Sequence, residues 1–261
     1  MNGGLLARWR RFRENRAVAR RPIPDDLWRR TLNRYPFLKR RDAADNAELR
    51  RLASLFLDRK EFTAVGSVKL TNDVVVAVAA QACLPVLRLG LARYDGFVGI
   101  VLHSDPVVAR REVSDDDGVV HEYDEVVSGE AMSGGPLMLS WRDVRTAGRS
   151  AALGYNVAIH EFAHVLDMAN GQPDGVPLLP EELTRDGWLD TLAQEREALV
   201  QRVDAGKETA LDPYGLEGLE EFFAVASEVF FVAPLRLQAE HPALYRIFTH
   251  FYLQDPVNQT G

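Results

Sequence analysis

The segment His160-Glu161-Phe162-Ala163-His164 places two histidines around a glutamate. On a helix, residues four apart differ by about 40° around the axis and by about 6 Å along it. Both imidazoles can therefore bind one Zn²⁺ ion from the same face. Glu161 lies about 100° from His160, so it is poorly placed as a ligand but can act as a general base towards water at the metal. The segment predicts a hydrolytic zinc site.

The surroundings of this motif favour a metal site over an ordinary helix interior. The neighbouring positions are apolar and include Val157, Ile159, Val165 and Leu166. Two histidines and a glutamate on a buried helix need polar partners, because an unpaired buried polar group costs free energy. A metal ion is one such partner. The alternative is that other protein groups in the core satisfy these side chains.

A catalytic zinc ion needs a third protein ligand and one open position. The remaining histidines are scattered along the chain, at positions 103, 121, 241 and 250. The segment from Glu220 to Glu228 is a better source, because it is strongly apolar and still contains three glutamates. On a helix, Glu221 and Glu228 share one stripe with the small Ala224, which allows a close approach to the motif helix.

The elements that must position these residues are helices around a small sheet, which is an α+β fold. The sequence favours helices over residues 24–60, 74–86, 150–169, 188–203 and 219–231. It favours strands over residues 94–103, 119–127 and 136–141, and a loop or strand over 60–70. We expect Ser150 to cap the motif helix, Asn170-Gly171 to end it, and the sheet to be antiparallel in part.

Composition places the chain among ordinary globular proteins, with 261 residues of which 46% are hydrophobic and 26% are charged. It contains no run of 18 uncharged apolar residues, so we expect no transmembrane helix. The start of the chain lacks the features of a secretory signal. The single cysteine, Cys83, cannot form an internal disulfide, so we expect a reducing, cytoplasmic location.

The net charge of -7 conceals an uneven distribution, because residues 1–51 carry 15 lysines and arginines against six acidic residues. We expect a basic N-terminal arm over residues 1–22 and a single zinc metallopeptidase domain over residues 23–261. A basic segment can bind nucleic acid. Here we expect it to be solvated, or to dock on the acidic body or on a protein partner, and we expect neither a membrane nor a nucleic-acid partner.

Four segments carry a resemblance to a known family: HEFAHVLDMANG (160–171), Val176-Pro177, DPYG (212–215) and EFFAVASEVFF (221–231). Together they resemble the Mlc titration factor A family of zinc peptidases. That family belongs to the gluzincin group and is related in its catalytic core to the anthrax lethal factor protease. The resemblance is clearest over residues 60–255. It implies a zincin-like metallopeptidase fold with a small mixed sheet, an HExxH active-site helix and flanking helices.

The resemblance also implies the roles of individual residues. His160, His164 and Glu221 would bind one zinc ion, Glu161 would be the base, and Tyr214 would stabilise the oxyanion. The chain departs from the family pattern just before the third ligand, where Gly218-Leu219-Glu220 stands in place of the family's Asn-Pro or Asp-Pro. Glu220 is therefore the alternative ligand.

Two more acidic residues and one strand are expected beside the site. Asp167 follows His164 on the same stripe, and we expect it either to hydrogen-bond a ligand histidine or to tie down the loop at 170–172. Glu228 is expected to orient a ligand, the alternative being a paired surface charge. The resemblance implies that an edge strand beside the motif helix binds the substrate backbone. We assign that strand to Gly135, Pro136, Leu137 and Met138.

These observations predict a zinc-dependent peptidase that hydrolyses peptide substrates with a glutamate general base. The resemblance favours an aminopeptidase that acts on short unblocked peptides and has a role in sugar-uptake control. The alternative is a regulatory protein that binds and sequesters a transcriptional repressor such as Mlc, with a zinc site that is mainly structural. In that alternative Glu161 is dispensable.

Overall fold

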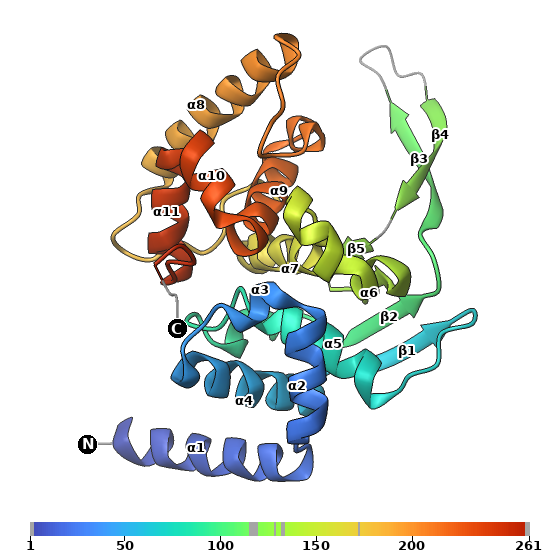
Figure 1. Cartoon of the computed structure of the whole chain (residues 1–261), viewed down its shortest axis with the longest axis vertical. Helices are drawn as coiled ribbons and strands as arrows, with labels where there is room; N and C mark the ends of the chain where they lie inside the picture. The colour runs from blue at the N-terminus through green and yellow to red at the C-terminus, as the bar shows by residue number, and fades with distance from the viewer. Residues whose placement is uncertain (1–2, 115–119, 128, 132–133, 172, 259–261) are drawn as a thin grey trace.

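The computed structural model describes residues 3–114, 120–127, 129–131, 134–171 and 173–258, and it has a mixed α+β fold (Figure 1). Helices from the beginning of the chain form the lower part of Figure 1, and helices from its end form the upper part. The predicted fold class, helices around a small mixed sheet, is confirmed. Within the described residues, no helix is both long enough and apolar enough to cross a membrane.

The main sheet has the strand order β1 (Glu61–Val65), β2 (Gly99–His103), β6 (Leu137–Ser140) and β5 (Gly129–Ala131). The first three are parallel, and β5 runs antiparallel to β6. The sheet is therefore antiparallel in part, as expected. β3 (Val107–Ser114) and β4 (Val120–Val127) form a separate antiparallel hairpin that extends away from the body (Figure 1). Neither β3 nor β5 was predicted from the sequence.

The helices fall into two groups along the chain. Those from the first third of the chain are α1 (Gly3–Arg20), α2 (Asp25–Arg34), α3 (Pro36–Lys39), α4 (Ala43–Arg59) and α5 (Asn72–Cys83). Those after β6 are α6 (Trp141–Ser150), α7 (Val157–Asp167), α8 (Arg185–Asp204), α9 (Leu219–Val232), α10 (Pro234–Glu240) and α11 (Pro242–Tyr252). Short 3₁₀ helices occur at η1 (Leu91–Tyr94), η2 (Ala151–Leu153), η3 (Met168–Asn170) and η4 (Pro213–Leu216).

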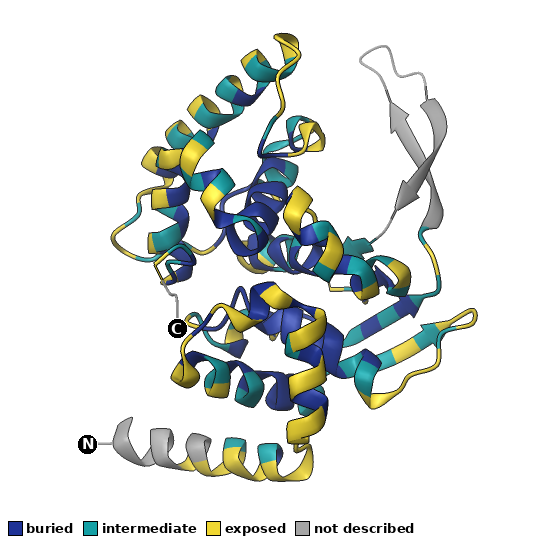
Figure 2. Cartoon of the chain, in the orientation of Figure 1, coloured by how far each residue is buried: buried dark blue, intermediate teal, exposed yellow. Residues whose placement is uncertain are grey.

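Residues 3–20 of the segment predicted as a basic arm form helix α1, which packs along α4 at the edge of the molecule (Figure 2). Arg20 of α1 forms an ion pair with Asp58 of α4 at 2.9 Å, and Glu14 of α1 pairs with Arg51 of α4 at 3.2 Å. Exposed ion pairs of this kind contribute at most about 1 kcal/mol each. Some of the basic charge at this end of the chain is thus paired within the protein.

Helix α7, which carries the HExxH motif, begins later than the sequence predicts. The prediction of Ser150 as its N-cap is wrong, because Ser150 is the last residue of α6, whose own cap is Ser140. Gly154, with a φ of +91°, then turns the chain, a conformation that favours glycine. Asn156 caps α7 with its side-chain oxygen. The predicted stop is confirmed, since Gly171, with a φ of +100°, follows η3.

Two aromatic clusters fix the helices that form the site. On α7, the fully buried Phe162 has its ring centroid 5.0–6.0 Å from those of Phe56, Tyr94 and Phe97. The aromatic residues of α9 pack in a second cluster with rings of α8 and α11, made of Trp188, Phe223, Phe230, Phe248 and Phe251. Figure 2 shows α7 and α9 among the most continuously buried parts of the chain, together with α5.

We predict that Phe162→Ala lowers the free energy of unfolding by about 3–5 kcal/mol, because it removes a large buried ring and leaves a cavity. Urea unfolding of the metal-free protein measures this change. The matched control is Leu235→Ala on α10, whose side chain is 68% exposed; it should change the stability by less than about 0.5 kcal/mol. Equal effects in the two variants would contradict the role assigned to the cluster.

Candidate metal centre

Three side chains converge at the interface of α7 and α9. His160 and His164 come from α7 and Glu221 comes from the first turn of α9, and their ligand atoms form a group capable of holding a metal ion. The two imidazole Nε2 atoms lie 3.1 Å apart. Glu221 Oε2 lies 3.1 Å from Nε2 of His160 and 3.4 Å from Nε2 of His164. The three predicted ligands therefore meet at one point.

The spacing of these atoms fits a metal ion better than it fits hydrogen bonds. A tetrahedral zinc ion with bonds of about 2.0–2.1 Å holds its ligand atoms about 3.3–3.4 Å apart, close to the observed 3.1–3.4 Å. Glu221 Oε2 is buried and has no partner in hydrogen-bond geometry. A buried carboxylate oxygen without a donor is unfavourable, and an ion at the centre of the three atoms would satisfy it.

Glu228, two helical turns after Glu221, holds the first ligand in orientation. Its Oε1 lies 2.8 Å from Nδ1 of His160, and its Oε2 accepts a hydrogen bond from the backbone N–H of Asn156. With Nδ1 of His160 donating to Glu228, the lone pair of Nε2 is left for a metal. Glu228 is almost completely buried, so it is not a paired surface charge.

Two polar residues of this network escaped the sequence analysis. Asn156 caps α7 and donates from Nδ2 to Oε1 of Gln81 at 2.9 Å. Gln81 is fully buried in α5 and also donates to the carbonyl of Ala77. A buried chain of polar groups thus runs from α5 through α7 and α9 to His160. The available signal was a lone glutamine in the apolar sequence of α5, since a buried amide requires partners.

The predicted base, Glu161, lies against the edge strand β5. A Cβ atom on Gly129 would meet the Glu161 carboxyl group at 2.5–2.6 Å, so only glycine allows this approach. Glu161 is 4% exposed. Burial raises its pKa to about 7, although the two histidines act in the opposite direction. A carboxylate with a pKa near neutrality can both accept and return a proton at physiological pH.

His160 and Glu221, which flank the metal position, each shift the pKa of the other. Burial alone would lower the pKa of His160, but Glu221 and Glu228 outweigh it and raise that pKa well above its ordinary value. Burial alone would raise the pKa of Glu221, but the two imidazoles hold it below its usual range. Without a metal, a proton on His160 compensates the carboxylates. A cation would replace that proton.

Tyr214 stands on the open side of the site. It lies on η4, where Asp212 caps the turn by accepting a hydrogen bond from the Tyr214 N–H at 2.9 Å. Its ring centroid lies 6.2 Å from that of His160, and the side chain is 38% exposed. Tyr214 is therefore next to the ligands and accessible from outside.

The structure bears on two predicted alternatives. Glu220, the alternative third ligand, is not in the ligand group; its carboxylate lies beside Gly218, at the N-terminus of α9. Asp167 accepts a hydrogen bond from the backbone N–H of Gly175 at 2.8 Å. Among the described hydrogen bonds it has none to His164, so it ties down the following loop. The anchor is Gly175 rather than residues 170–172.

The segment assigned to the substrate strand needs a correction. Gly135 and Pro136 precede β6, and Leu137 and Met138 lie within it. β6 pairs with β2 on one side and β5 on the other, so it is not an edge strand. Among the described strands, the edge of the sheet beside α7 belongs to β5, which is too short to show an alternating pattern in the sequence.

The site defines the chain as a protein of the metallopeptidase class, because an HExxH helix with a glutamate from a second helix gives the His₂Glu donor set of catalytic zinc sites. The sequence comparison agrees. The chain belongs to the family described as glucose-regulated metallo-peptidase M90, which matches residues 8–253. The predicted resemblance to the Mlc titration factor A family is confirmed by the relatives.

Mlc titration factor A of Salmonella arizonae is 38% identical over 237 residues, which cover 89% of this chain and 92% of that protein. The Klebsiella pneumoniae (strain 342) protein of the same name is 36% identical over 227 residues, covering 86% and 84%. An uncharacterized Synechocystis protein is 34% identical over 251 residues, covering 95% and 90%.

We predict that Glu221→Gln weakens metal binding at least about 100-fold, because it removes a charged ligand, while Glu220→Gln changes it less than about twofold. The two residues are neighbours with the same side chain, so each variant is the control for the other. A competition titration with a chromophoric chelator measures both affinities. The reverse order of effects would make Glu220 the ligand.

We also predict that metal affinity rises with pH through the neutral range, by about tenfold per pH unit for each proton released. The reason is that His160, whose pKa is raised, must lose its proton before Nε2 can bind a cation. Chelator competition at pH 6, 7 and 8 gives the slope. Glu228→Gln should make it shallower, since it removes one of the two carboxylates that stabilise the protonated imidazole. A slope of zero in the unmodified protein would contradict this assignment.

Proposed function

We propose that this protein is a zinc-dependent peptidase with a zincin-like fold of the gluzincin type. The observation that carries the proposal is the convergence of His160, His164 and Glu221 beside the buried carboxylate of Glu161. The donor set suits Zn²⁺, which prefers nitrogen and carboxylate ligands in four-coordinate sites with one open position. When bound, such an ion supplies Lewis-acid chemistry that stabilises negative charge on oxygen.

In the proposed reaction, Glu161 takes a proton from the attacking water and then passes it to the leaving amine. The raised pKa of Glu161, about 7, suits both steps. The phenol of Tyr214 donates a hydrogen bond to the carbonyl oxygen of the scissile bond as negative charge develops there. Glu228 keeps the imidazole of His160 in one orientation and one tautomer throughout.

The peptide substrate would bind to the free edge of β5 by main-chain hydrogen bonds. β5 is the edge of the main sheet and contacts α7, with Gly129 directly against Glu161. A peptide paired with this edge would therefore have its backbone beside the base. This assignment replaces the segment 135–138 as the strand that faces the substrate.

The finer proposal is an aminopeptidase with a role in sugar-uptake control. An aminopeptidase needs a carboxylate for the free α-amine. Glu228 is excluded because its oxygens already accept from His160 and Asn156, so our candidate is Glu220, next to the ligand Glu221. The family's description as glucose-regulated supports the link to sugar.

We predict that Glu161→Gln keeps the metal and loses peptidase activity by about 10²–10⁴-fold, the contribution typical of a general base. The glutamine has nearly the same shape, so packing against Gly129 should survive. Metal content and kcat/KM on unblocked and blocked peptides are measured together, and Glu220→Gln, which should also keep the metal, should lose activity towards unblocked peptides only. Full activity of Glu161→Gln would refute the mechanism. Equal cleavage of blocked peptides would refute the aminopeptidase assignment.

A second candidate function is binding of a repressor protein. The relatives named Mlc titration factor A support it, and the site would then be mainly structural. Pull-down of purified Mlc by the metal-loaded protein and by Glu161→Gln, together with a peptidase assay, distinguishes repressor binding from peptide hydrolysis. Mlc binding that is equal in both, with no peptide cleavage by either, favours the second function. Cleavage without Mlc binding favours the first.

A further inference from the structure

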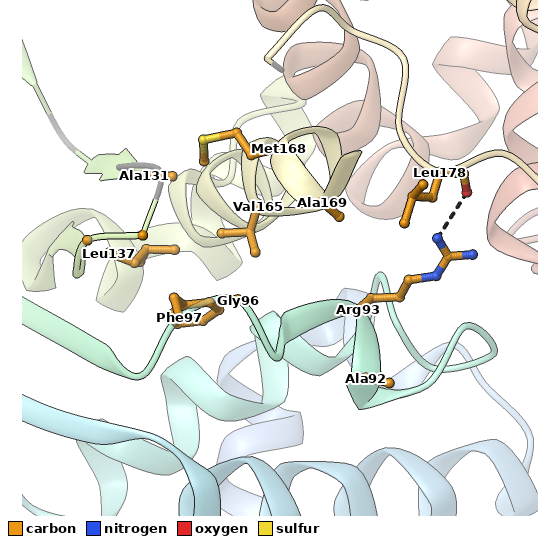
Figure 3. A pocket seen from close by; sticks show the side chains of 12 residues that line it. Ala92, Arg93, Gly96, Phe97, Ala131, Leu137, Val165, Met168, Ala169 and Leu178 are labelled. Atoms are coloured by element: carbon orange, nitrogen blue, oxygen red, sulfur yellow. Dashed lines mark hydrogen bonds between the residues drawn. The ribbon is translucent and has the colours of Figure 1, made fainter. Parts of the chain in front are cut away.

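We propose that the cavity whose walls include Phe97, Leu137, Val165 and Met168 is a subsite for one large aliphatic or aromatic side chain of the peptide substrate, next to the scissile bond. This inference rests on the proposed peptidase function and adds its substrate class. The cavity has a volume of about 300 Å³ and lies between α7, the residues Gly134 and Gly135 that precede β6, and the segment joining η1 to β2 (Figure 3). That volume is at the lower end of the range for small-ligand pockets, about 300–1,000 Å³.

Two walls of the cavity include residues of the elements that carry Glu161 and Gly129, namely α7 and β5. Val165 on α7 and Met168 at the start of η3 follow Glu161 by four and seven residues, so all three lie close to one stripe where η3 continues from α7. On β5, Gly129 and Ala131 are two residues apart and face the same side of the sheet. Gly129 touches Glu161, and Ala131 lines the cavity. A peptide along the edge of β5 would pass from the base to the mouth of the cavity.

The chemistry of the lining selects the kind of side chain. Phe97, Leu137, Val165 and Met168 supply an apolar surface (Figure 3). At the rim, Arg93 donates from Nη1 to the backbone oxygen of Leu178 at 3.0 Å. Within the described part of the chain, Arg93 forms no ion pair. Its positive charge would repel a lysine or arginine side chain, while the apolar walls would bind leucine or phenylalanine.

The wall opposite α7 is held in place before any substrate binds. Nζ of Lys60 donates hydrogen bonds to the backbone oxygens of Tyr94 and Phe97. The same ammonium group lies 3.7 Å from the centroid of the Phe97 ring, in a cation–π contact. These contacts fix the segment that carries Phe97. A pocket that is already formed does not have to be ordered when the substrate binds, which favours affinity.

The test is a set of unblocked peptides in which alanine, leucine, phenylalanine or lysine occupies each position flanking the scissile bond. In the metal-loaded protein, leucine or phenylalanine at one position should raise kcat/KM at least about tenfold over alanine, and lysine should not. Ala169→Trp adds a large ring at an exposed residue that lines the cavity. This variant should reduce the preference in kcat/KM for leucine or phenylalanine over alanine to about twofold or less. Ala47→Trp, at an exposed residue of α4 outside the cavity, should keep it.

Binding of the same peptides to metal-loaded Glu161→Gln, measured by calorimetry, separates this inference from the proposed function. Selective binding of leucine or phenylalanine peptides that the wild-type protein does not cleave would support the subsite and contradict the peptidase. Cleavage with equal rates for alanine and leucine peptides would overturn the subsite and leave the peptidase. If the Ala169→Trp variant keeps the preference for leucine or phenylalanine, the subsite assignment is also overturned. It is likewise overturned if no peptide binds at all.

Discussion

The buried carboxylate of Glu228 is the constraint on which the rest of the site depends. It receives hydrogen bonds from His160 and from the backbone of Asn156, the residue that begins α7. A buried carboxylate deprived of such donors costs several kcal/mol. Helix α9 is therefore stable against α7 only in the register that brings these donors to Glu228. Because Glu221 lies two turns earlier on the same helix, this register also sets its carboxylate between the two imidazoles. A single buried group thus positions ligands from two helices.

The edge strand imposes a second constraint, which acts on the base. β5 approaches α7 so closely that a side chain at position 129 has no room. This contact removes Glu161 from water and accounts for the raised pKa of a carboxyl group that faces two imidazoles. Glycine is needed here because of the space and not because of the backbone angle, since Gly129 is not among the glycines with positive φ. The same strand is the edge of the main sheet among the described residues, so burial of the base and an edge that an extended peptide can pair with arise from one element.

The sequence predicted those parts of the site whose geometry lies within one element. His160 and His164 are four residues apart on a helix, so their common direction follows from helix geometry alone. Residue spacing did not distinguish Glu221 from Glu220, because the choice depends on how α9 is rotated against α7. Gln81 and Asn156 were visible as polar residues near apolar segments, but their partners lie on other helices. β5 was missed because three residues carry no periodicity, and the interior position of β6 depends on that pairing. Asp167 lies on the same stripe of α7 as His164, which favours a histidine partner. Its hydrogen-bond donor in the structure is instead the backbone N–H of Gly175.

The hairpin of β3 and β4 is an excursion from the sheet between β2 and β5 (Figure 1). β2 pairs directly with β6, and β5 pairs with the other side of β6. The pairing of the four strands in the main sheet therefore does not involve the hairpin. The entropic cost of closing a loop grows only slowly with its length. The length and sequence of this excursion can therefore change during evolution with little effect on the metal centre. Since the excursion leads directly into the edge strand, it is also where related proteins can acquire different surroundings for the same catalytic residues.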